Sequence, residues 1–260
     1  MTDAILTVNA GSSSVKFQLF GYDAALPLLA EGHVSGIGGT PNFAARNAQD
    51  PADAVEKKLP AGATHEEAIR GIVEWVHGHD AGWRIAAVAH RIVHGGTEFD
   101  APVRVDSHIF HRLKELIPLA PLHQPHNLAA LGIAERLLAH APQIACFDTA
   151  FHARHDPLFT AFALPQDISD KGVRRYGFHG LSYDWIAHVL RREHAGLAAG
   201  RVVVAHLGNG ASLCALQGGR SIDTTMGMTA LDGLPMGTRC GAIDAGAVIY
   251  MIRDLGLAAD

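Results

Sequence analysis

The alternation of apolar and polar residues predicts two short strands at the start of the chain. Residues 5–8 form an apolar run that suits a buried strand, and Val15, Phe17 and Leu19 alternate with polar residues as in a half-buried strand. Gly11 and three serines separate the two segments, so the pattern predicts strand, turn, strand. A Walker A loop would need GxxxxGK[ST] leading into a helix, so this turn is not a P-loop of that kind.

Helical spacing appears after residue 63. Thr64 and Glu67 form a capping box, and apolar residues follow at Ile69, Ile72, Val73 and Val76. Further helices are predicted at residues 107–117, 127–140 and 182–192 and around residues 248–255, and buried strands at residues 85–89, 143–147 and 202–205. Strands that alternate with helices predict an α/β fold with largely parallel sheets.

Two segments should lack long helices. Residues 32–62 are rich in Gly, Pro, Asn and Asp, which predicts a peripheral excursion of loops and short strands. Pro118, Pro121 and Pro125 interrupt the helical pattern and predict a rigid, looped linker between two helices.

A segment with the same pattern as the opening motif recurs about 200 residues later. Aligning Gly11 with Gly208 superposes ILTVNAGSSSVKF on VVVAHLGNGASLC, so strand, small-residue turn and strand recur. We therefore expect two similar halves whose glycine turns face one another across a cleft. Backbone N–H groups of such turns can bind a polyphosphate.

Composition narrows the class of protein. At 260 residues the chain is long enough for two domains, and its net charge of -5 comes with scattered basic residues, which argues against binding to nucleic acid or an anionic membrane. No apolar run reaches membrane-spanning length and no signal peptide is apparent, so we expect a cytoplasmic protein. The three cysteines should be reduced, packed thiols, and the 17 histidines form no metal-binding motif.

Seven motifs carry a resemblance to a known family. In chain order they are NAGSSSVKF, HRIVHGG, PLHQPHN, FDTAFH, RRYGFHG, HLGNGAS and MGTRCGAID. In order and spacing they resemble the acetate kinase family, whose fold belongs to the superfamily of sugar kinases, chaperone ATPases and actin.

This resemblance implies a fold, an activity and partners. The fold would be an α/β actin-like ATPase fold with a duplicated βββαβαβα core: residues 1–150 form the first domain, with a phosphate loop and a substrate arginine, and residues 151–260 form part of the second, with the other phosphate loop. The activity would be reversible phosphoryl transfer from ATP to acetate or another short-chain carboxylate, with Mg²⁺ (or Mn²⁺), in a homodimer.

The proposed reaction needs fixed positive charge. A carboxylate that attacks the γ-phosphate meets like charges, each pair of which repels by about 4 kcal/mol at 4 Å and an effective dielectric near 20. The resemblance assigns Arg91 to the substrate and Arg239 to the transition state. A lone arginine in a surface salt bridge is the ordinary alternative.

Three more residues are candidates by resemblance. Asp148, at the end of an apolar strand, would be a catalytic acid/base or positioning residue, and we favour positioning because a carboxylate nucleophile needs no deprotonation. A helix N-cap is its structural alternative. His179 would stabilise the transition state, although a lone histidine is more often structural. His123 would contact the substrate or only support the site.

The two phosphate motifs supply the remaining candidates. By resemblance, the ATP- and phosphate-binding residues are Ser12, Ser14, Lys16, His206, Leu207, Gly208, Asn209 and Gly210, and the metal ligand is Asn9. Lys16 could instead lie along a strand with only its ammonium group in water. One amide is a poor sole ligand for Mg²⁺, so water molecules must complete the octahedron.

The substrate pocket departs from the family pattern. Val93, Leu122 and Phe178 would line the acyl end, and Ala230 stands where the family usually has proline. A lost proline ring should enlarge the pocket and admit propionate. Gln124 and Ala242 replace the usual Asn and Asp, and the latter change removes a carboxylate partner expected for Arg239.

Three hypotheses follow. The chain resembles about two thirds of a family member and lacks the adenosine-binding glycine motifs and the magnesium-binding glutamate. It is therefore either an acetate kinase, catalytic in its complete form, or a truncated, inactive fragment or pseudo-enzyme. A sugar kinase or chaperone-like ATPase would share the fold but not RRYGFHG and MGTR in this order.

Overall fold

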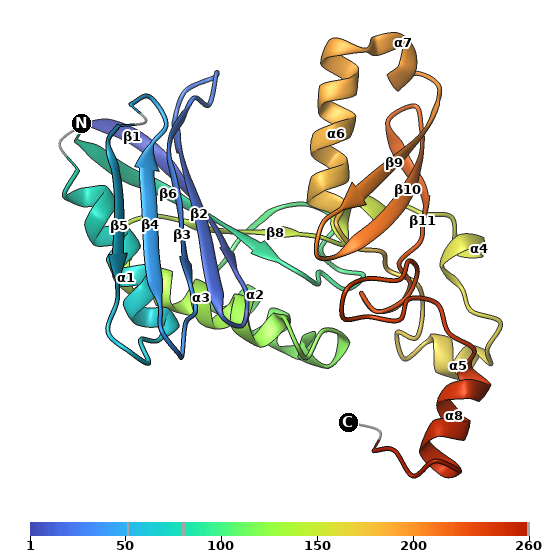
Figure 1. Ribbon diagram of the computed structural model, residues 1–260. Coiled ribbons are helices and arrows are strands. Elements are labelled where there is room, and N and C mark those ends of the chain that lie inside the picture. Colours follow the sequence, from blue (N-terminus) through green and yellow to red (C-terminus); the bar gives the residue numbers. More distant parts are fainter. Residues whose placement is uncertain (51, 80–81, 259–260) are drawn as a thin grey trace. The chain divides into compact units, whose positions relative to one another are not determined.

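The chain folds as two compact units, Met1–Phe147 and Asp148–Asp260, in a computed structural model that describes residues 1–50, 52–79 and 82–258 (Figure 1). Each unit has a sheet and helices of its own, and each is described separately below. Among the described residues, no helix is both long and apolar enough to cross a membrane.

The first unit is built on an eight-stranded sheet with the order β5-β4-β3-β2-β1-β6-β8-β7. Its strands are β1 (Thr2–Ala10), β2 (Ser14–Gly21), β3 (Leu28–Ser35), β4 (Asn42–Asn47), β5 (Ala54–Lys58), β6 (Trp83–Ile92), β7 (Val103–Arg104) and β8 (Gln143–Phe147). The apolar runs at residues 5–8, 85–89 and 143–147 and the alternating pattern from Val15 all lie in these strands, which confirms those predictions.

The prediction of largely parallel sheets is wrong. In the described part of the large sheet, only the β1–β6 and β6–β8 pairs are parallel, and the others are antiparallel. Strands β1 to β5 follow one another through short turns, and a short turn reverses the chain direction. Only the strands that come after helical connections pair in parallel.

Residues 32–62 are not a peripheral excursion. Their strands β3 and β4 belong to the large sheet, and Phe43 on β4 is completely buried. The ring of Phe43 stacks on Phe17 of β2 at 6.4 Å between centroids and meets the edge of Trp75 at 6.2 Å. The short strands were predicted, but their place in the core was not.

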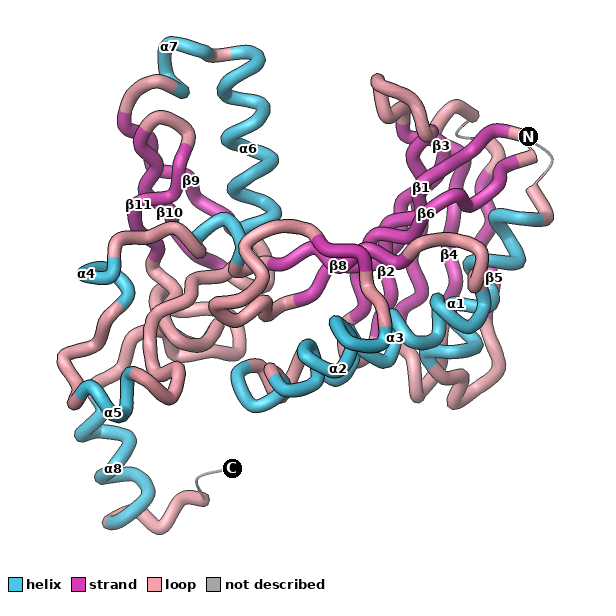
Figure 2. Tube along the Cα trace, turned by 180° about the vertical axis from the view of Figure 1, so that it is seen from behind, coloured by secondary structure: helices cyan, strands magenta, loops and turns pink. Residues whose placement is uncertain are grey.

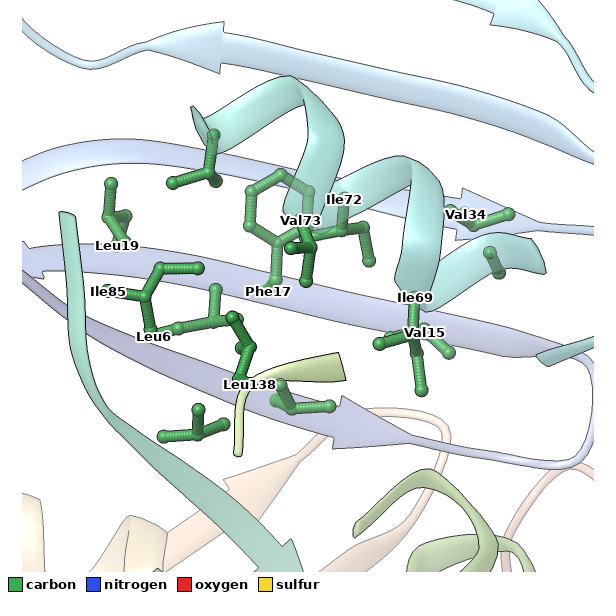
Figure 3. Packing of buried hydrophobic residues seen from close by; sticks show 14 of the residues in the cluster. Leu6, Val15, Phe17, Leu19, Val34, Ile69, Ile72, Val73, Ile85 and Leu138 are labelled. Atoms are coloured by element: carbon green, nitrogen blue, oxygen red, sulfur yellow. The ribbon is translucent and has the colours of Figure 1, made fainter. Parts of the chain in front are cut away.

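Helices cover the apolar side of the large sheet. Helix α1 (His65–His77) begins at the predicted capping box of Thr64 and Glu67, and its residues Ile69, Ile72 and Val73 pack against Phe17 and neighbouring strand residues (Figure 3). Helix α2 (Ser107–Glu115), the 3-10 helix η1 (Ile117–Leu119) and helix α3 (Gln124–Leu137) follow. Helix α3 starts earlier than predicted because Pro125 occupies its first turn, where proline is tolerated.

Two buried histidines make the first unit sensitive to acid. Burial lowers the pKa of both His90 and His94 to about 4, whereas an unfolded histidine titrates near 6.5. The unfolded chain therefore binds more protons between these values. The stability contributed by the neutral imidazoles is complete above about pH 6.5 and is lost as the pH falls from there toward about 4.

We expect the free energy of unfolding of this unit to drop by roughly 3 kcal/mol per histidine across that window. Urea titrations at several pH values, followed by the fluorescence of Trp75 and Trp83, measure the drop. The variant His90→Gln should flatten the dependence, whereas His77→Gln, at an exposed position, should not. An equal slope in all three proteins would contradict the assignment.

The second unit contains a three-stranded antiparallel sheet with the order β11-β10-β9. Its strands are β9 (Arg201–Leu207), β10 (Ala211–Gln217) and β11 (Arg220–Thr224). Helix α6 (Gly180–Glu193) lies along this sheet in both views (Figures 1 and 2), and its Tyr183 and Ala187 pack against Cys214 and Leu216 of β10. The predicted strand at residues 202–205 and helix at 182–192 are confirmed.

Shorter helices complete the second unit. They are η2 (Ala150–His152), α4 (Pro157–Thr160), α5 (Gln166–Ser169), α7 (Ala195–Ala198) and α8 (Ala245–Arg253). Helix α8 confirms the helix suggested by the pattern around residues 248–255. None of its residues is buried, so its apolar side chains at Ile249 and Ile252 are exposed.

The cysteines are free thiols, as predicted, but they are not all packed. Cys214 is buried and Cys146 is half-buried, whereas Cys240 is exposed. Burial raises the pKa of the Cys214 thiol to about 11, so this sulfur stays protonated and unreactive at neutral pH.

Candidate functional site

The serine motif forms the tight turn of the β1–β2 hairpin. The backbone N–H of Gly11 donates to the Ser14 carbonyl at 2.8 Å, and Asn9 pairs with Lys16 across the two strands. Ser12 and Lys16 are exposed. His65, the first residue of α1, donates from Nε2 to the Gly11 carbonyl at 2.7 Å and so helps to fix the turn.

Arg91 lies beside this turn. It is near the end of β6, the parallel neighbour of β1, and its Nη1 donates to Oδ1 of Asn9 at 3.3 Å. The pairing of two parallel strands thus brings together a guanidinium and an amide that stand 82 residues apart in the sequence. Arg91 and Asn9 are both half-buried, so part of each side chain still meets solvent.

Asn127 fixes the spacing between these two segments. This side chain is almost fully buried on α3, where its Nδ2 donates to the Ala10 carbonyl at 2.8 Å and its Oδ1 accepts from the Val93 N–H at 3.0 Å. Ala10 precedes the serine turn and Val93 follows Arg91 by two residues. The side-chain amide of Asn127 therefore links the serine turn to the segment that contains Arg91.

Replacing Asn127 by alanine should destabilise the first unit by about 3 kcal/mol, because the Ala10 carbonyl and the Val93 N–H would lose their buried partner. Guanidinium unfolding followed by tryptophan fluorescence measures the change. The control Glu135→Ala alters an exposed residue of the same helix and should stay within about 0.5 kcal/mol of the parent chain. Equal effects of the two substitutions would contradict the bridging role.

The proline-rich segment holds the same region in place. Gln124 is completely buried and makes three hydrogen bonds: it accepts from the His94 N–H at 3.2 Å and donates to the carbonyls of His94 and Leu113 at 3.1 and 3.3 Å. Its neighbour His123 is exposed at the start of α3. Of the predicted pocket residues, Val93 is buried, whereas Leu122 is 71% exposed.

The second unit repeats the hairpin. Strands β9 and β10 pair antiparallel, and the N–H of Gly208 donates to the Gly210 carbonyl at 3.0 Å, as Gly11 does to Ser14 in the first turn. The recurrence in the sequence is therefore confirmed as two β-hairpins with tight turns. Leu207 and Asn209 are exposed at this second turn.

His179 lies close to the second hairpin in an unusual conformation. It has φ 59° and ψ 17°, in the left-handed region, directly before α6. Few non-glycine residues adopt this region, and such strain is often retained at functional sites. Its ring stacks on that of His206 at 4.1 Å, and its Nδ1 lies 2.8 Å from the Ser212 hydroxyl of β10.

The backbone around His179 is held from two sides. The N–H of Gly180 donates to the Asp148 carbonyl at 2.8 Å, and a Cβ on Gly180 would lie only 2.2 Å from that oxygen, so only glycine is accommodated. On the other side, Nε2 of His152 donates to the Phe178 carbonyl at 3.0 Å. Asp148 and Phe178 are both 2% exposed.

Arg239 approaches the second hairpin as well. Its Nη1 donates to the Ala230 carbonyl at 2.7 Å, which orients the guanidinium although the family's usual aspartate is absent at Ala242. A Cβ built on Gly210 would lie 3.0 Å from Nε2 of His179 and 3.3 Å from Nη2 of Arg239. Nε2 of His179 and Nη2 of Arg239 therefore lie beside the same residue of the turn, and an imidazole and a guanidinium in such a place can together bind an anionic oxygen.

The residues do not form a complete metal site by themselves. No group of three or more histidine, cysteine or carboxylate side chains in the described residues could hold a metal ion. Asn9 offers a single amide oxygen that already accepts from Arg91. This set fits only a metal ion whose other ligands are phosphate oxygens and water.

Each unit therefore gathers part of the predicted set. The structure brings Asn9 and Arg91 together in the first unit and His179, His206, Gly210 and Arg239 together in the second. The sequence interpretation missed the supporting residues, which are His65, Asn127, His152, Tyr183 and Ser212. Asn127 could have been found, because it is a polar residue on the apolar face of a helix, four positions before Leu131.

Comparisons with known proteins identify the family of the chain. The family model described as the acetokinase family matches residues 4–260. The acetate kinase of Rhodopseudomonas palustris is 48% identical over 266 residues, an alignment that covers 100% of this chain and 66% of the relative. The acetate kinase of Nitrobacter hamburgensis is 47% identical and is covered to 64% of its length.

Solved structures are similar as well. The acetate kinase of Porphyromonas gingivalis superposes with a TM-score of 0.84 at 35% identity, with 99% of this chain and 65% of that chain covered. A propionate kinase from Francisella tularensis superposes with a TM-score of 0.87 at 32% identity, with 99% and 66% covered. The chain spans about two thirds of these proteins and shares their actin-like α/β fold. It belongs to the acetokinase family.

Proposed function

We propose that this chain carries the phosphoryl-transfer machinery of an acetate kinase, which forms an acyl phosphate and ADP from ATP and a short carboxylate. The observation that carries the proposal is that Nε2 of His179 and Nη2 of Arg239 both lie beside Gly210 in the second hairpin turn. The similarity to acetate kinases supports the substrate class.

The chemistry assigns each group a role. A carboxylate oxygen attacks the γ-phosphorus, the bond from that phosphorus to the bridging oxygen breaks, and ADP leaves with the electron pair. In this proposal Arg91 binds the acyl carboxylate, and the guanidinium of Arg239 with the imidazole of His179 neutralises charge on the transferring phosphoryl oxygens. The backbone N–H groups of the serine and glycine turns bind further phosphate oxygens. Asp148 would act by orienting these groups.

The test uses two proteins. One is the 260-residue chain; the other, called the extended chain below, is this chain joined to the part of the Rhodopseudomonas palustris enzyme that it does not cover. Each is incubated with ATP, acetate and hydroxylamine, which traps acyl phosphate as hydroxamate. Hydroxamate from the extended chain supports the proposal, and its absence from both proteins would sink it.

The inactive fragment or pseudo-enzyme of the sequence analysis is the second candidate, and the same assay tests it. Hydroxamate from the extended chain alone would show that the 260-residue chain lacks a required part. Hydroxamate from both proteins would exclude the inactive fragment.

Propionate should be accepted nearly as well as acetate. By the family pattern, Ala230 stands where proline is usual, so we expect a roomier pocket, and one methylene changes discrimination by only about 1 to 3 kcal/mol. We expect comparable kcat/KM values for the two acids in the extended chain. The variant Ala230→Pro keeps the carbonyl that accepts from Arg239 and should disfavour propionate by roughly tenfold or more. Strong rejection of propionate by the parent chain would contradict this prediction.

Three further properties belong to the same proposal. Magnesium would arrive with the phosphates of ATP, with Asn9 supplying one oxygen and water most of the others. The complete protein would form a homodimer, which analytical ultracentrifugation tests directly. It would act in the cytoplasm.

A further inference from the structure

A buried pair of hydroxyl groups lies behind His179. Ser212 and Tyr183 are both completely inaccessible to solvent. The Ser212 Oγ lies 2.8 Å from Nδ1 of His179 and also hydrogen-bonds to the phenol oxygen of Tyr183. The imidazole thus has one nitrogen against this pair, while its other nitrogen, Nε2, lies on the side of Gly210 and Arg239.

The direction of these hydrogen bonds follows from counting protons. The backbone of His206 hydrogen-bonds to the Tyr183 oxygen, and burial raises the pKa of this phenol, so Tyr183 keeps its proton. A phenol oxygen can accept more than one hydrogen bond, but its own buried O–H needs an acceptor, and the Ser212 oxygen is the acceptor that lies within hydrogen-bonding distance. The Ser212 O–H then has Nδ1 of His179 as its acceptor.

We propose that Tyr183 and Ser212 are positioning residues that hold the His179 imidazole in the tautomer with its proton on Nε2. The inference rests on the proposed function, since its purpose is to present an N–H donor to a phosphoryl oxygen. With Nδ1 accepting from Ser212, Nε2 carries the hydrogen on the side of Gly210, where Nη2 of Arg239 also lies.

The opposite tautomer would work against phosphoryl transfer. If Nδ1 carried the proton and donated to Ser212, a lone pair on Nε2 would face the developing negative charge. In that tautomer both Nδ1–H and the Tyr183 O–H would need the Ser212 oxygen as their acceptor. The O–H of Ser212 would then have to turn toward the phenol oxygen, whose own proton already points at Ser212. A buried donor without an acceptor is costly, so the hydroxyl pair selects one arrangement of protons.

Histidine tautomers can be read by NMR without any enzymatic activity. The 260-residue chain is labelled with ¹⁵N-histidine, and the His179 ring is assigned by comparison with His179→Gln. We expect a protonated Nε2 and an unprotonated, hydrogen-bonded Nδ1. In Tyr183→Phe, Ser212 loses its donor and can accept from Nδ1–H, so a mixture of tautomers should appear.

Two serine variants complete the set. Ser212→Thr retains the hydroxyl and should retain the parent tautomer, whereas Ser212→Ala should lose the preference. The ring signals of His152, which bonds to Ser221 and Phe178 in the same unit, report whether each variant keeps its fold. A proton on Nδ1 of His179 in the parent chain would overturn the proposal, as would a tautomer unchanged in a folded Tyr183→Phe.

The kinetic consequence is measured in the extended chain. Tyr183→Phe should lower kcat for hydroxamate formation by about tenfold and leave the KM for acetate unchanged. An unaltered kcat in a variant with the mixed tautomer would overturn the positioning role. If the extended chain is inactive with every side chain in place, the proposed function fails, while the NMR result still decides whether the hydroxyl pair sets the tautomer.

Discussion

Replacing Arg239 by alanine should lower kcat for acyl phosphate formation in the extended chain by about 10³- to 10⁵-fold, the range found for arginines that stabilise phosphoryl transfer. The Arg239 guanidinium is anchored by the Ala230 carbonyl at 2.7 Å, and its Nη2 lies 3.3 Å from a Cβ built on Gly210. One nitrogen is thus held, while the other lies beside Gly210, where we propose that the anion binds. Because the transition state gains most from this charge, kcat and kcat/KM should fall together.

Two controls separate charge from geometry. Arg239→Lys keeps the charge, but one ammonium group cannot contact both the Ala230 carbonyl and an anion as the planar guanidinium can. We therefore expect a kcat between that of the parent and that of the alanine variant. Arg220→Ala removes an exposed arginine from β11 of the same unit and should leave the rate unchanged. A fall in rate of less than about tenfold for Arg239→Ala would contradict a role in the transition state.

Local patterns predicted the elements well, because each depends on nearby residues. The capping box at Thr64, the apolar run at residues 143–147 and the recurrence of the Gly11 pattern at Gly208 all correspond to observed features. Strand direction was mispredicted because the pattern of one strand does not reveal its partner. The place of β4 in the core was likewise missed, since its polar residues conceal the single large ring of Phe43, which is completely buried.

Site residues could be predicted only where a motif marked them. Arg91, His179 and Arg239 were found through motifs, and the structure adds the contacts that orient them. Tyr183 and Ser212 carry no motif signal, because a tyrosine in a helix and a serine in a strand are ordinary. Their significance comes from a hydrogen-bonded contact between residues 29 positions apart, which periodicity cannot reveal.

Substituting alanine for Gly210 should lower kcat/KM in the extended chain by about 10²-fold, a cost comparable to misplacing a reacting group by about 1 Å. The added methyl group would lie 3.0 Å from Nε2 and 3.2 Å from Cε1 of His179, and 3.3 Å from Nη2 of Arg239. It would therefore crowd both side chains and push them from their places beside the turn. The fold should survive, because Gly210 does not have a positive φ.

Gly208→Ala is the matched control for this prediction. It adds the same methyl group to the same turn, but the nearest atoms are the Gly210 carbonyl oxygen at 3.5 Å and Nε2 of His206 at 3.9 Å, which are ordinary contacts. The two variants should unfold at similar denaturant concentrations and differ in kcat/KM by at least about tenfold. Equal activities of the two variants would mean that the places of His179 and Arg239 beside Gly210 do not matter for the reaction, because only Gly210→Ala crowds both side chains.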